Sequence, residues 1–395
     1  MDREETYMAE WIECSIGDLC DTISDTYKGN DEYVVLVNTS DVLEGKVLNH
    51  ETVANKNLKG QFKKTFKRDD ILYSEIRPAN KRFAYIDFEN TSNYIASTKL
   101  MVLRHNEKVL PEYLFALLKS NYVIAELQHL AETRSGTFPQ ITFSSELAPM
   151  KVLLPDKDTQ KRIVSILSSI EQKIDKNNEI NNNLEQQAKV LYKDWFFDFS
   201  PFSSDGNLPN GWHFGTVGDI IQLHDSKRVP LSGAERDKMA KVYPYYGATS
   251  LMDYVDNYLF DGIYLLLGED GTVVDSLGFP ILQYVYGQFW VNNHAHIITG
   301  KEGFSVEELY LFFSLTNIKS IVTGAVQQKV SQQNLKKVPA IIPSKQALSA
   351  FDEIIQPIFA QIRNLRDENA NLSQLRDTLL PKLMSGELDV SDIDL

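Results

Sequence analysis

The chain has 395 residues, of which 43% are hydrophobic and 24% charged, so its composition is globular and its length allows two or three domains. Its two cysteines, Cys14 and Cys20, fit a reducing cytoplasm and exclude a disulfide scaffold. Taken over the whole chain, the net charge of −14 argues against a nucleic-acid partner. The acidic start is unlike a signal peptide and the apolar runs are short, so we expect a cytoplasmic protein that does not associate with a membrane.

The first part of the chain predicts a module with a local excess of positive charge. Between Lys56 and Arg82 there are nine basic residues and three acidic ones. Two interpretations stay open for this stretch: an ordinary solvated surface, or a face that follows DNA phosphates. Strand-like runs at Tyr33–Val37 and Ile71–Tyr73, with a short helix at Pro111–Leu118, give the module a mixed α+β pattern.

Residues 160–197 are rich in asparagine but have the periodicity of a long helix. Seam positions recur with a 4,3 spacing over Ile163–Trp195, a pattern typical of a coiled coil. Asn177 and Asn181 fall in this seam, where a buried amide weakens packing but fixes the register of the helices. Asparagines that merely face solvent are the alternative interpretation. A helix of this extent would span roughly 57 Å at about 1.5 Å per residue.

After a segment rich in breaker residues, Phe199–Gly211, the pattern of a mixed module returns. Strand-like runs at Ile263–Leu267 and Ala295–Ile298 precede a second short helix at Val306–Leu315. The second module therefore has the same α+β character as the first.

The final part of the chain repeats the long helix. A constant shift in numbering places Asn181 on Asn369, and a second heptad seam covers Phe351–Leu383. Pro357 lies near the start of this seam, so we expect a kink or a restart of the helix there.

The resulting order is module, long helix, module, long helix. We predict an α+β fold with two modules that have curved sheets, joined by two long helices that form an antiparallel intramolecular coiled coil with approximate two-fold symmetry. The predicted boundaries are 1–153 for the first module, 154–199 for the central helical spacer, 200–341 for the second module and 342–395 for the C-terminal helical spacer. Two modules at a fixed separation suit a DNA target made of two half-sites.

Four stretches carry a resemblance to a known family. They are LLPDKDTQKRIVSILSSIEQKI with the later NNNLEQQAKVLYKDWFFDFSPF, the C-terminal QLRDTLLPKLMSGEL, Asp69–Pro78 (DDILYSEIRP) and Tyr245–Gly271. In their order along the chain, these stretches resemble the specificity subunit of type I restriction–modification systems over nearly the whole chain. The resemblance implies that each module recognises half of a bipartite double-stranded DNA target. It also implies that the helices set the spacing and dock two methyltransferase subunits, with restriction subunits as a further possible partner.

The resemblance places the cofactors S-adenosylmethionine, ATP and magnesium in the partner subunits, and none in this chain. The sequence agrees, since it has no Asn/Asp-Pro-Pro-aromatic tetrapeptide and no G-x-x-x-x-G-K-[ST] phosphate loop. Gly268–Thr272 (GEDGT) is interpreted as a turn. We therefore predict a subunit without catalytic residues. The alternatives are a specificity subunit of a related methyltransferase or nuclease without a translocating restriction subunit, an enzyme with its own active site, and a coiled-coil adaptor that binds only protein.

Two groups of residues could suggest a metal or nuclease site. His294 and His296 alternate on a predicted strand, for which cross-strand packing or base contact is the simpler interpretation, and no metal ligands are predicted. Asp69, Asp70 and Glu75 are interpreted as residues that cap and solvate a turn.

The candidate DNA contacts are basic, amide and tyrosine side chains that can bond to phosphates or base edges. In the first module they are Lys63, Lys64, Lys67, Arg68, Arg77, Lys81, Arg82, Arg134 and Gln140. In the second module they are Lys227, Arg228, Lys241, Tyr245, Tyr246, Gln327, Gln328 and Lys329. Arg134 and the run Gln327–Lys329 are expected in corresponding loops before the long helices. Phe196 and Phe197 are predicted to be exposed partner contacts, and Trp195 to continue the seam.

Overall fold

The computed structural model describes residues 11–56, 58, 60–203, 206–324 and 327–390. The chain forms two compact units, one made of Met1–Asp175 with Asn369–Leu395 and the other of Lys176–Glu368. Each unit holds one sheet-bearing module and parts of both long helices, α3 (Lys157–Phe196) and α8 (Lys345–Ser385). The division of the chain into units therefore falls within the long helices, whereas the sequence placed the domain boundaries near the helix ends.

Among its described residues the first module contains twelve strands. They are β1 (Ile12–Ser15), β2 (Cys20–Ile23), β3 (Tyr33–Val37), β4 (Val42–Leu43), β5 (Lys46–Val47), β6 (Thr52–Ala54), β7 (Phe62–Lys64), β8 (Ile71–Ser74), β9 (Phe83–Tyr85), β10 (Tyr94–Ser97), β11 (Leu100–His105) and β12 (Lys151–Leu154). One four-stranded sheet has the order β2-β11-β8-β9 and the other β6-β3-β10-β7, in which β3 and β10 run parallel. The pairs β1–β12 and β4–β5 form two further small sheets.

The central strands of the first module are buried on both faces, which explains their unbroken apolar sequences. In β8, Ile71 and Tyr73 face a core shared with the helices, while Leu72 faces a core shared with the other sheet. A strand covered on both faces needs apolar residues at successive positions rather than alternating ones. The run that the sequence assigned to a strand therefore lies at the centre of the module.

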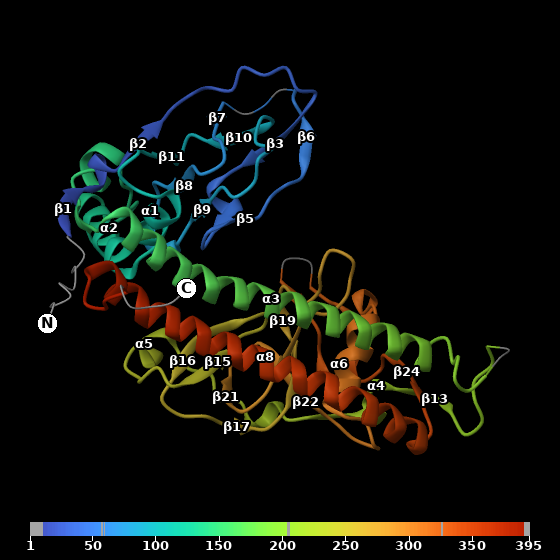
Figure 1. Cartoon of the computed structure of the whole chain (residues 1–395). Coiled ribbons are helices and arrows are strands. Elements are labelled where there is room, and N and C mark those ends of the chain that lie inside the picture. Colours follow the sequence, from blue (N-terminus) through green and yellow to red (C-terminus); the bar gives the residue numbers. More distant parts are fainter. Residues whose placement is uncertain (1–10, 57, 59, 204–205, 325–326, 391–395) are drawn as a thin grey trace, which may run out of the picture. The chain divides into compact units, whose positions relative to one another are not determined.

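Two helices pack against this sheet, α1 (Pro111–Leu118) and α2 (Asn121–Arg134). Proline suits the first turn of α1, and the Ser120 hydroxyl caps α2 by accepting from the backbone N–H of Val123. Shorter helical turns are η1 (Ile16–Asp18), η2 (Thr39–Asp41), η3 (Pro78–Asn80) and η4 (Phe143–Leu147). Figure 1 shows α1 and α2 beside the first turns of α3, with which they share a core.

In the part of the second module that the structure describes there are another twelve strands. They are β13 (His213–Thr216), β14 (Ile221–Leu223), β15 (Tyr243–Tyr246), β16 (Leu251–Val255), β17 (Phe260–Asp261), β18 (Tyr264–Gly268), β19 (Asp270–Gly271), β20 (Leu282–Val285), β21 (Gln288–Val291), β22 (Ala295–Gly300), β23 (Gln328–Lys329) and β24 (Pro339–Ile342). Its helices and turns are α4 (Val217–Ile220), η5 (Asp225–Lys227), α5 (Gly233–Arg236), α6 (Val306–Leu315), η6 (Lys319–Ile321) and α7 (Gln332–Leu335). A capping box between Ser305 and Glu308 starts α6.

The two modules have the same topology, which confirms the internal repeat. The order β14-β22-β18-β20 reproduces β2-β11-β8-β9, and β16-β15-β21-β17 reproduces β6-β3-β10-β7. In the second module β15 and β21 are parallel, as β3 and β10 are in the first. The pair β13–β24 matches β1–β12. The predicted α+β class is therefore correct, and the two modules are copies of one design.

The long helices run antiparallel within the second unit. Asn177 of α3 donates from Nδ2 to Oε2 of Glu368 at 2.8 Å, while further along α3 the ring of Tyr192 lies 5.6 Å from that of Phe351, near the start of α8. Later residues of α3 thus meet earlier residues of α8. The helix α8 continues through Pro357 as one element, so the predicted restart is wrong (Figure 1). Among the helices of the described residues, none has the length and apolarity to cross a membrane.

The predicted seam of α3 is packed in both units. In the first unit its residues Ile163 and Leu167 share a core with the predicted Leu383 of α8 and with Leu380, which lies outside the predicted seam, while the predicted Leu379 is half-buried. In the second unit both seam asparagines of α3 are buried, Asn177 at 0% and Asn181 at 8% exposed. Asn369 is half-buried. The interpretation of the asparagine-rich stretch as a helix with buried seam amides is therefore confirmed.

Candidate nucleic-acid interface

A half-buried glutamate follows the central strand of the first module. Glu75 lies directly after β8, and its Oε2 accepts hydrogen bonds from Gln140 Nε2 at 2.9 Å and from Lys99 Nζ at 3.3 Å. The backbone holds the same groups together, since Glu75 N donates to Lys99 O at 3.0 Å and Ile141 N donates to Glu75 O at 2.8 Å. We call Glu75, Lys99 and Gln140 the first polar frame.

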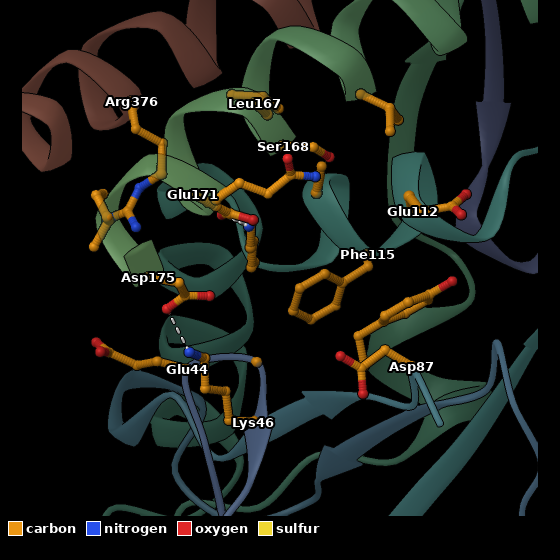
Figure 2. Close-up of a pocket in the computed structure, with 17 residues that line it drawn as sticks. Glu44, Lys46, Asp87, Glu112, Phe115, Leu167, Ser168, Glu171, Asp175 and Arg376 are labelled. Carbon is orange, nitrogen blue, oxygen red and sulfur yellow. Dashed lines mark hydrogen bonds and ion pairs between the residues drawn. The ribbon is translucent and has the colours of Figure 1, made fainter. Parts of the chain in front are cut away.

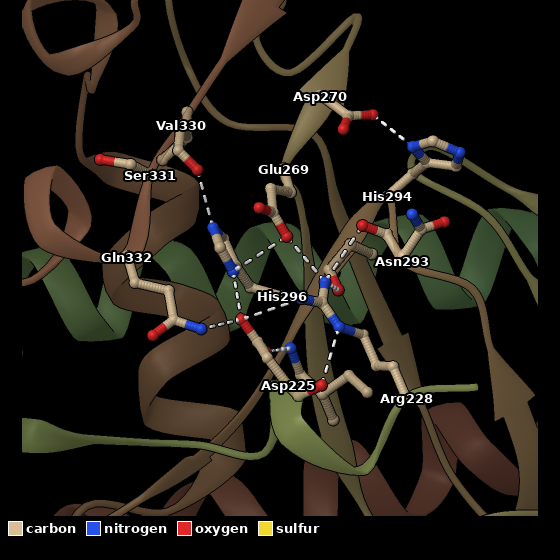
Figure 3. A network of polar contacts seen from close by, with 12 residues as sticks. Asp225, Arg228, Glu269, Asp270, Asn293, His294, His296, Val330, Ser331 and Gln332 are labelled. Atoms are coloured by element: carbon tan, nitrogen blue, oxygen red, sulfur yellow. Dashed lines mark hydrogen bonds and ion pairs between the residues drawn. The ribbon is translucent and has the colours of Figure 1, made fainter. Parts of the chain in front are cut away.

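A glutamate occupies the matching place in the second module. Glu269 follows β18, its N donates to His294 O at 2.8 Å, and its O accepts from Val330 N at 2.8 Å. Its carboxylate accepts from Arg228 Nη1 at 2.7 Å and lies 3.5 Å from Lys329 Nζ. Figure 3 shows Glu269 with His294 and Arg228 around it. We call Glu269, His294 and Lys329 the second polar frame.

The strand registers make the two frames equivalent position by position. Leu100 pairs with Ser74 in the first module, and Ala295 pairs with Gly268 in the second, so the residue before each strand, Lys99 or His294, lies beside the glutamate. Gln140 bridges to Ile76, as Lys329 pairs with Asp270. The glutamate is the same in both frames, whereas the side chains around it differ.

The predicted DNA contacts of the first module divide into exposed and engaged side chains. Lys63, Lys67, Arg68, Arg77 and Arg134 are exposed. Of these, Arg68 pairs with Glu89 at 2.7 Å and Arg134 with Glu146 at 3.2 Å. The pair of Arg68 with Glu89 is exposed on both sides and therefore weak, so this guanidinium group can exchange it for a phosphate, whereas Glu146 is only 12% exposed.

Four other predicted contacts bond within the module. Lys64 Nζ donates to the carbonyl of Leu100 at 2.8 Å, and Arg82 Nη1 donates to the carbonyl of Ser40 at 3.0 Å. Lys81 pairs with Glu44 at 3.4 Å, and Gln140 belongs to the first polar frame. Burial lowers the pKa of Lys64 from its ordinary value, which weakens its case as a phosphate contact.

In the second module the predicted contacts lie in different environments. Lys227, Lys241, Gln327 and Lys329 are exposed, while Gln328 and Tyr246 are half-buried. Lys241 Nζ bonds to Asp253 Oδ1 at 2.9 Å, and the ring of Tyr246 lies 5.9 Å from that of Phe289. Gln327, Gln328 and Lys329 form one run beside the second polar frame.

Two predicted contacts of the second module are contradicted by burial. Tyr245 is 1% exposed, and its hydroxyl accepts from Leu231 N at 3.0 Å, so this side chain belongs to the core and has no surface for DNA. The Arg228 side chain is 14% exposed and is held between Glu269 and the carbonyl of Ala295, to which Nη1 donates at 2.8 Å. Both residues support the fold rather than the interface.

Arg134 and the run Gln327–Lys329 do not lie in corresponding loops. Arg134 is the last residue of α2, for which the second module has no long counterpart among its described helices. The register instead matches Gln140 with Lys329. The two segments do correspond, but Arg134 lies at the end of a helix and before the matched positions.

Asp225, Glu269 and His296 bring their ligand atoms within 4.8 Å of one another, a grouping that could hold a metal ion. Protein donors already occupy it. Asp225 Oδ2 lies 2.6 Å from His296 Nδ1 and accepts from Gln332 Nε2 at 2.6 Å, while Oδ1 accepts from Ile297 N at 2.9 Å. A cation would have to displace the guanidinium of Arg228, which bonds to Glu269. The donor set suits an internal ion-pair network rather than a metal centre (Figure 3).

The same network determines the direction in which the pKa of Asp225 is shifted. Burial alone would raise the pKa of Asp225, but the hydrogen bond and positive charge of His296, the N–H of Ile297 and the nearby Arg228 together hold this pKa below its ordinary value. His296 is fully buried, so it cannot contact a base, whereas His294 is exposed and bonds through Nδ1 to Asp270 Oδ1. The two histidines therefore have different roles.

The acidic residues near β8 differ from the prediction of a solvated turn. Asp70 is fully buried and accepts from Arg104 through two hydrogen bonds, Nε to Oδ1 at 2.8 Å and Nη2 to Oδ2 at 2.7 Å. Asp69 accepts from the hydroxyl of Tyr85 at 2.6 Å. Sequence reasoning also missed Lys99 and the role of Glu75. The signal lay in the alignment of SEIR with GEDG, in which Glu75 and Glu269 coincide.

Phe196 is not the exposed partner contact that the sequence suggested. It is 4% exposed, and its ring lies 4.9 Å from that of Phe351 and 5.7 Å from that of Trp212. Because α3 packs against both α8 and the second module, its buried face is wider than the two-position seam. Phe197, by contrast, is 43% exposed and lines an apolar groove of about 370 Å³ together with Phe214.

A second cavity, of about 420 Å³, lies in the first unit (Figure 2). Its walls come from the first module and from both long helices and carry more acids than bases. Lys46 Nζ bonds to Asp175 Oδ1 at 2.6 Å, and Lys119 pairs with Glu171. The bases present are thus matched by carboxylates, so this cavity does not attract a phosphate.

Comparison with known proteins identifies the design. The family model described as the type I restriction modification DNA specificity domain matches residues 8–186 and 209–374, one copy for each module. The chain belongs to this family of type I restriction–modification specificity subunits. It is 31% identical to the type I restriction enzyme HindI specificity subunit of Haemophilus influenzae, over 96% of this chain and 100% of that protein.

Another specificity subunit is similar at a lower identity. The chain is 26% identical to the type I restriction enzyme MjaIX specificity subunit of Methanocaldococcus jannaschii, over 72% of this chain and 71% of that protein. The crystal structure of a type I restriction–modification system S subunit from M. genitalium aligns with a TM-score of 0.51, at 16% identity, over 97% of this chain and 98% of that one. At that identity the likeness shows the fold alone.

Proposed function

We propose that this specificity subunit is a non-catalytic, sequence-specific DNA-binding protein in which each module recognises one half of a bipartite target. The observation that carries the proposal is the repetition of the whole module, including its polar frame, within one chain. A duplicated module offers two separate sites with one geometry, and the different side chains around Glu75 and Glu269 allow different half-sites.

The long helices supply the second part of the proposal, because they pass from one module to the other. Buried Asn177 and Asn181 oppose a sliding of α3 along α8, since a shifted register would leave their amides against apolar residues. We propose that this fixed register sets the spacing between the half-sites.

The acidic chain is proposed to bind DNA tightly only with partners. With a net charge of −14 it supplies few phosphate contacts in excess of its own carboxylates, and base contacts specify a sequence without providing most of the affinity. Two methyltransferase subunits would add phosphate contacts and would hold S-adenosylmethionine; restriction subunits, where present, would use ATP and magnesium. The groove beside Phe197 and Phe214 is the surface we propose for a methyltransferase contact.

The test is to express the chain with its methyltransferase partner and to map methylated adenines by sequencing. We expect two short motifs separated by a fixed number of unspecified bases. A single contiguous motif would contradict the two-module proposal. Replacing the second module with that of another specificity subunit should change one half-site alone, and an unchanged motif would favour a protein-only adaptor. Methyl transfer by the purified chain without partners would show an active site of its own.

A further inference from the structure

We propose that Lys99 and Gln140 select bases in one half-site, that His294 and Lys329 select bases in the other, and that Glu75 and Glu269 are the positioning residues of these two sets. The inference rests on the proposed function and adds to it the residues that determine specificity.

The two polar frames share the same backbone hydrogen bonds. Both glutamates donate from their backbone N–H to the residue before β11 or β22 and accept at their carbonyl from Ile141 or Val330, which shortly precede η4 and α7, with distances between 2.8 and 3.0 Å. Three chain segments thus meet at one point in each module. A base-reading surface needs such a rigid meeting point, because a side chain on a loose loop cannot discriminate bases.

The side chains around the two glutamates are more exposed than the glutamates themselves. Lys99 and His294 have the same side-chain exposure, 47%, and Lys329 is 51% exposed. The glutamates themselves are far less exposed, at 17% for Glu75 and 15% for Glu269. The fixed acid therefore lies below the surface and the differing side chains lie on it.

The side chains of both frames keep hydrogen-bond donors or acceptors that a DNA base can use. An ammonium group has three N–H donors, and the bond to Glu75 uses one from Lys99. Gln140 spends an N–H on the same carboxylate and keeps its carbonyl oxygen for a donor such as an adenine or cytosine amino group. His294 bonds to Asp270 through Nδ1, which leaves its Nε2 for a base edge.

The carboxylates beside Lys99 and Lys329 favour contact with a base over contact with a phosphate. A carboxylate 3.3 Å from Lys99 Nζ and another 3.5 Å from Lys329 Nζ would repel a phosphate and offset much of each lysine's charge. The edge of a base is neutral, so the carboxylate does not repel it and still fixes the direction of the donor. The frames therefore suit base edges better than the backbone of DNA.

The test uses the complete complex with its methyltransferase partner and the sequence map of methylated sites. The variants are Lys99→Ala and Gln140→Ala in the first module, and His294→Ala and Lys329→Ala in the second. We expect each variant to lower discrimination at one position of its own half-site by about five- to hundredfold, since a good base contact is worth that much. The other half-site should keep its sequence.

Lys108→Ala and Lys301→Ala are matched controls. Both residues are exposed and lie beyond the opposite ends of β11 and β22 from Lys99 and His294. They should leave both half-sites unchanged. A frame variant that slows methylation equally at all sequences, or that changes nothing, would overturn the inference.

Glu75→Gln and Glu269→Gln test the positioning role. Each keeps the size of the side chain but removes the charge that orients Lys99 or Lys329, so we expect a relaxed half-site in both variants. The melting temperature should stay unchanged for Glu75→Gln and fall for Glu269→Gln, because Glu269 also bonds to the largely buried Arg228. An unaltered motif would contradict that role. If the unmodified complex methylates no split sequence, the proposed function fails; if it does while all six variants retain its motif, this inference alone fails.

Discussion

The two polar frames hold the same glutamate in different ways. Glu75 of the first module bonds to Lys99 and Gln140, which both reach the surface, whereas Glu269 bonds to Arg228, a side chain that joins the buried network of Asp225. The second frame is therefore anchored in the core, while the first depends on partners that water can reach. The two modules thus keep the same backbone geometry with different side chains around the glutamate. The internal repeat is therefore easier to detect in the strand order than in the amino-acid sequence.

The largest expected effect tests the anchoring of the second module. Asp225→Ala removes the carboxylate that bonds to the buried ring of His296 and leaves Glu269 as the remaining carboxylate of Arg228, and breaking such a buried pair costs about 3–5 kcal/mol. Asp70→Ala in the first module should cost less, because the side chain of Arg104 is 29% exposed and can regain water. Urea unfolding followed by hydrogen exchange would measure both. Equal losses of unfolding free energy in the two variants would contradict the proposal that the second module is anchored more firmly in its core than the first.

The second prediction uses pH to distinguish the modules. The third residue of α6 is Glu308, whereas that of α1 is Tyr113, and both are fully buried. Burial, with the charge of Asp352, raises the pKa of Glu308 from 4.5 to about 8. The folded chain therefore keeps a proton that the unfolded chain releases, and this stabilisation is lost as the pH rises from about 4.5 to 8, by roughly 1.4 kcal/mol per pH unit.

Glu308→Gln should remove that slope and leave hydrogen exchange in the first module unchanged. The free energy of unfolding, measured at several pH values between 5 and 8.5 for both proteins, gives the difference. A variant with the same pH dependence as the original chain would show that Glu308 is already ionised in the folded state.

The sequence predicted the architecture well because the architecture follows from local patterns. The seams of α3 and α8, the bounds of α1 and α6 and the strand β3 were all correct, since heptads, capping residues and β-branched runs act over a few residues. The helix α2 was missed because its apolar stripe is narrow: four of its residues are buried.

The candidate interface was predicted less well because it depends on strand pairing. Lys99 and Gln140 are far apart in the sequence; the register of β8 with β11 brings Lys99 to Glu75, and a bridge between Ile76 and Gln140 brings Gln140 there. The burial of Tyr245 depends likewise on packing between β15 and the segment at Leu231. Composition identified a basic stretch but could not show which of its side chains bond internally.

The third prediction concerns the seam of the second unit, to which α3 contributes the buried amides of Asn177 and Asn181. Asn181 is 8% exposed, and its Oδ1 has no hydrogen-bond partner among the described residues. Asn181→Leu should therefore raise the stability of the second unit by about 1–2 kcal/mol. If the amide fixes the register, the same variant should broaden the spacing tolerated between half-sites. A destabilised variant with unchanged spacing would contradict both expectations.

The smallest effect on stability is expected at Arg134, and it separates folding from binding. Its pair with Glu146 involves a side chain that is 53% exposed, so Arg134→Ala should change the free energy of unfolding by less than about 1 kcal/mol. Arg228→Ala, at a side chain 14% exposed, should destabilise the second module instead.

If Arg134 contacts a phosphate, its loss should weaken DNA binding by the assembled complex at every sequence and lower the slope of log affinity against log salt by about 1. Fluorescence anisotropy at several salt concentrations measures that slope. An unchanged slope would remove Arg134 from the interface and leave the first polar frame as the main recognition surface of its module, because the frame was inferred to contact bases and not phosphates.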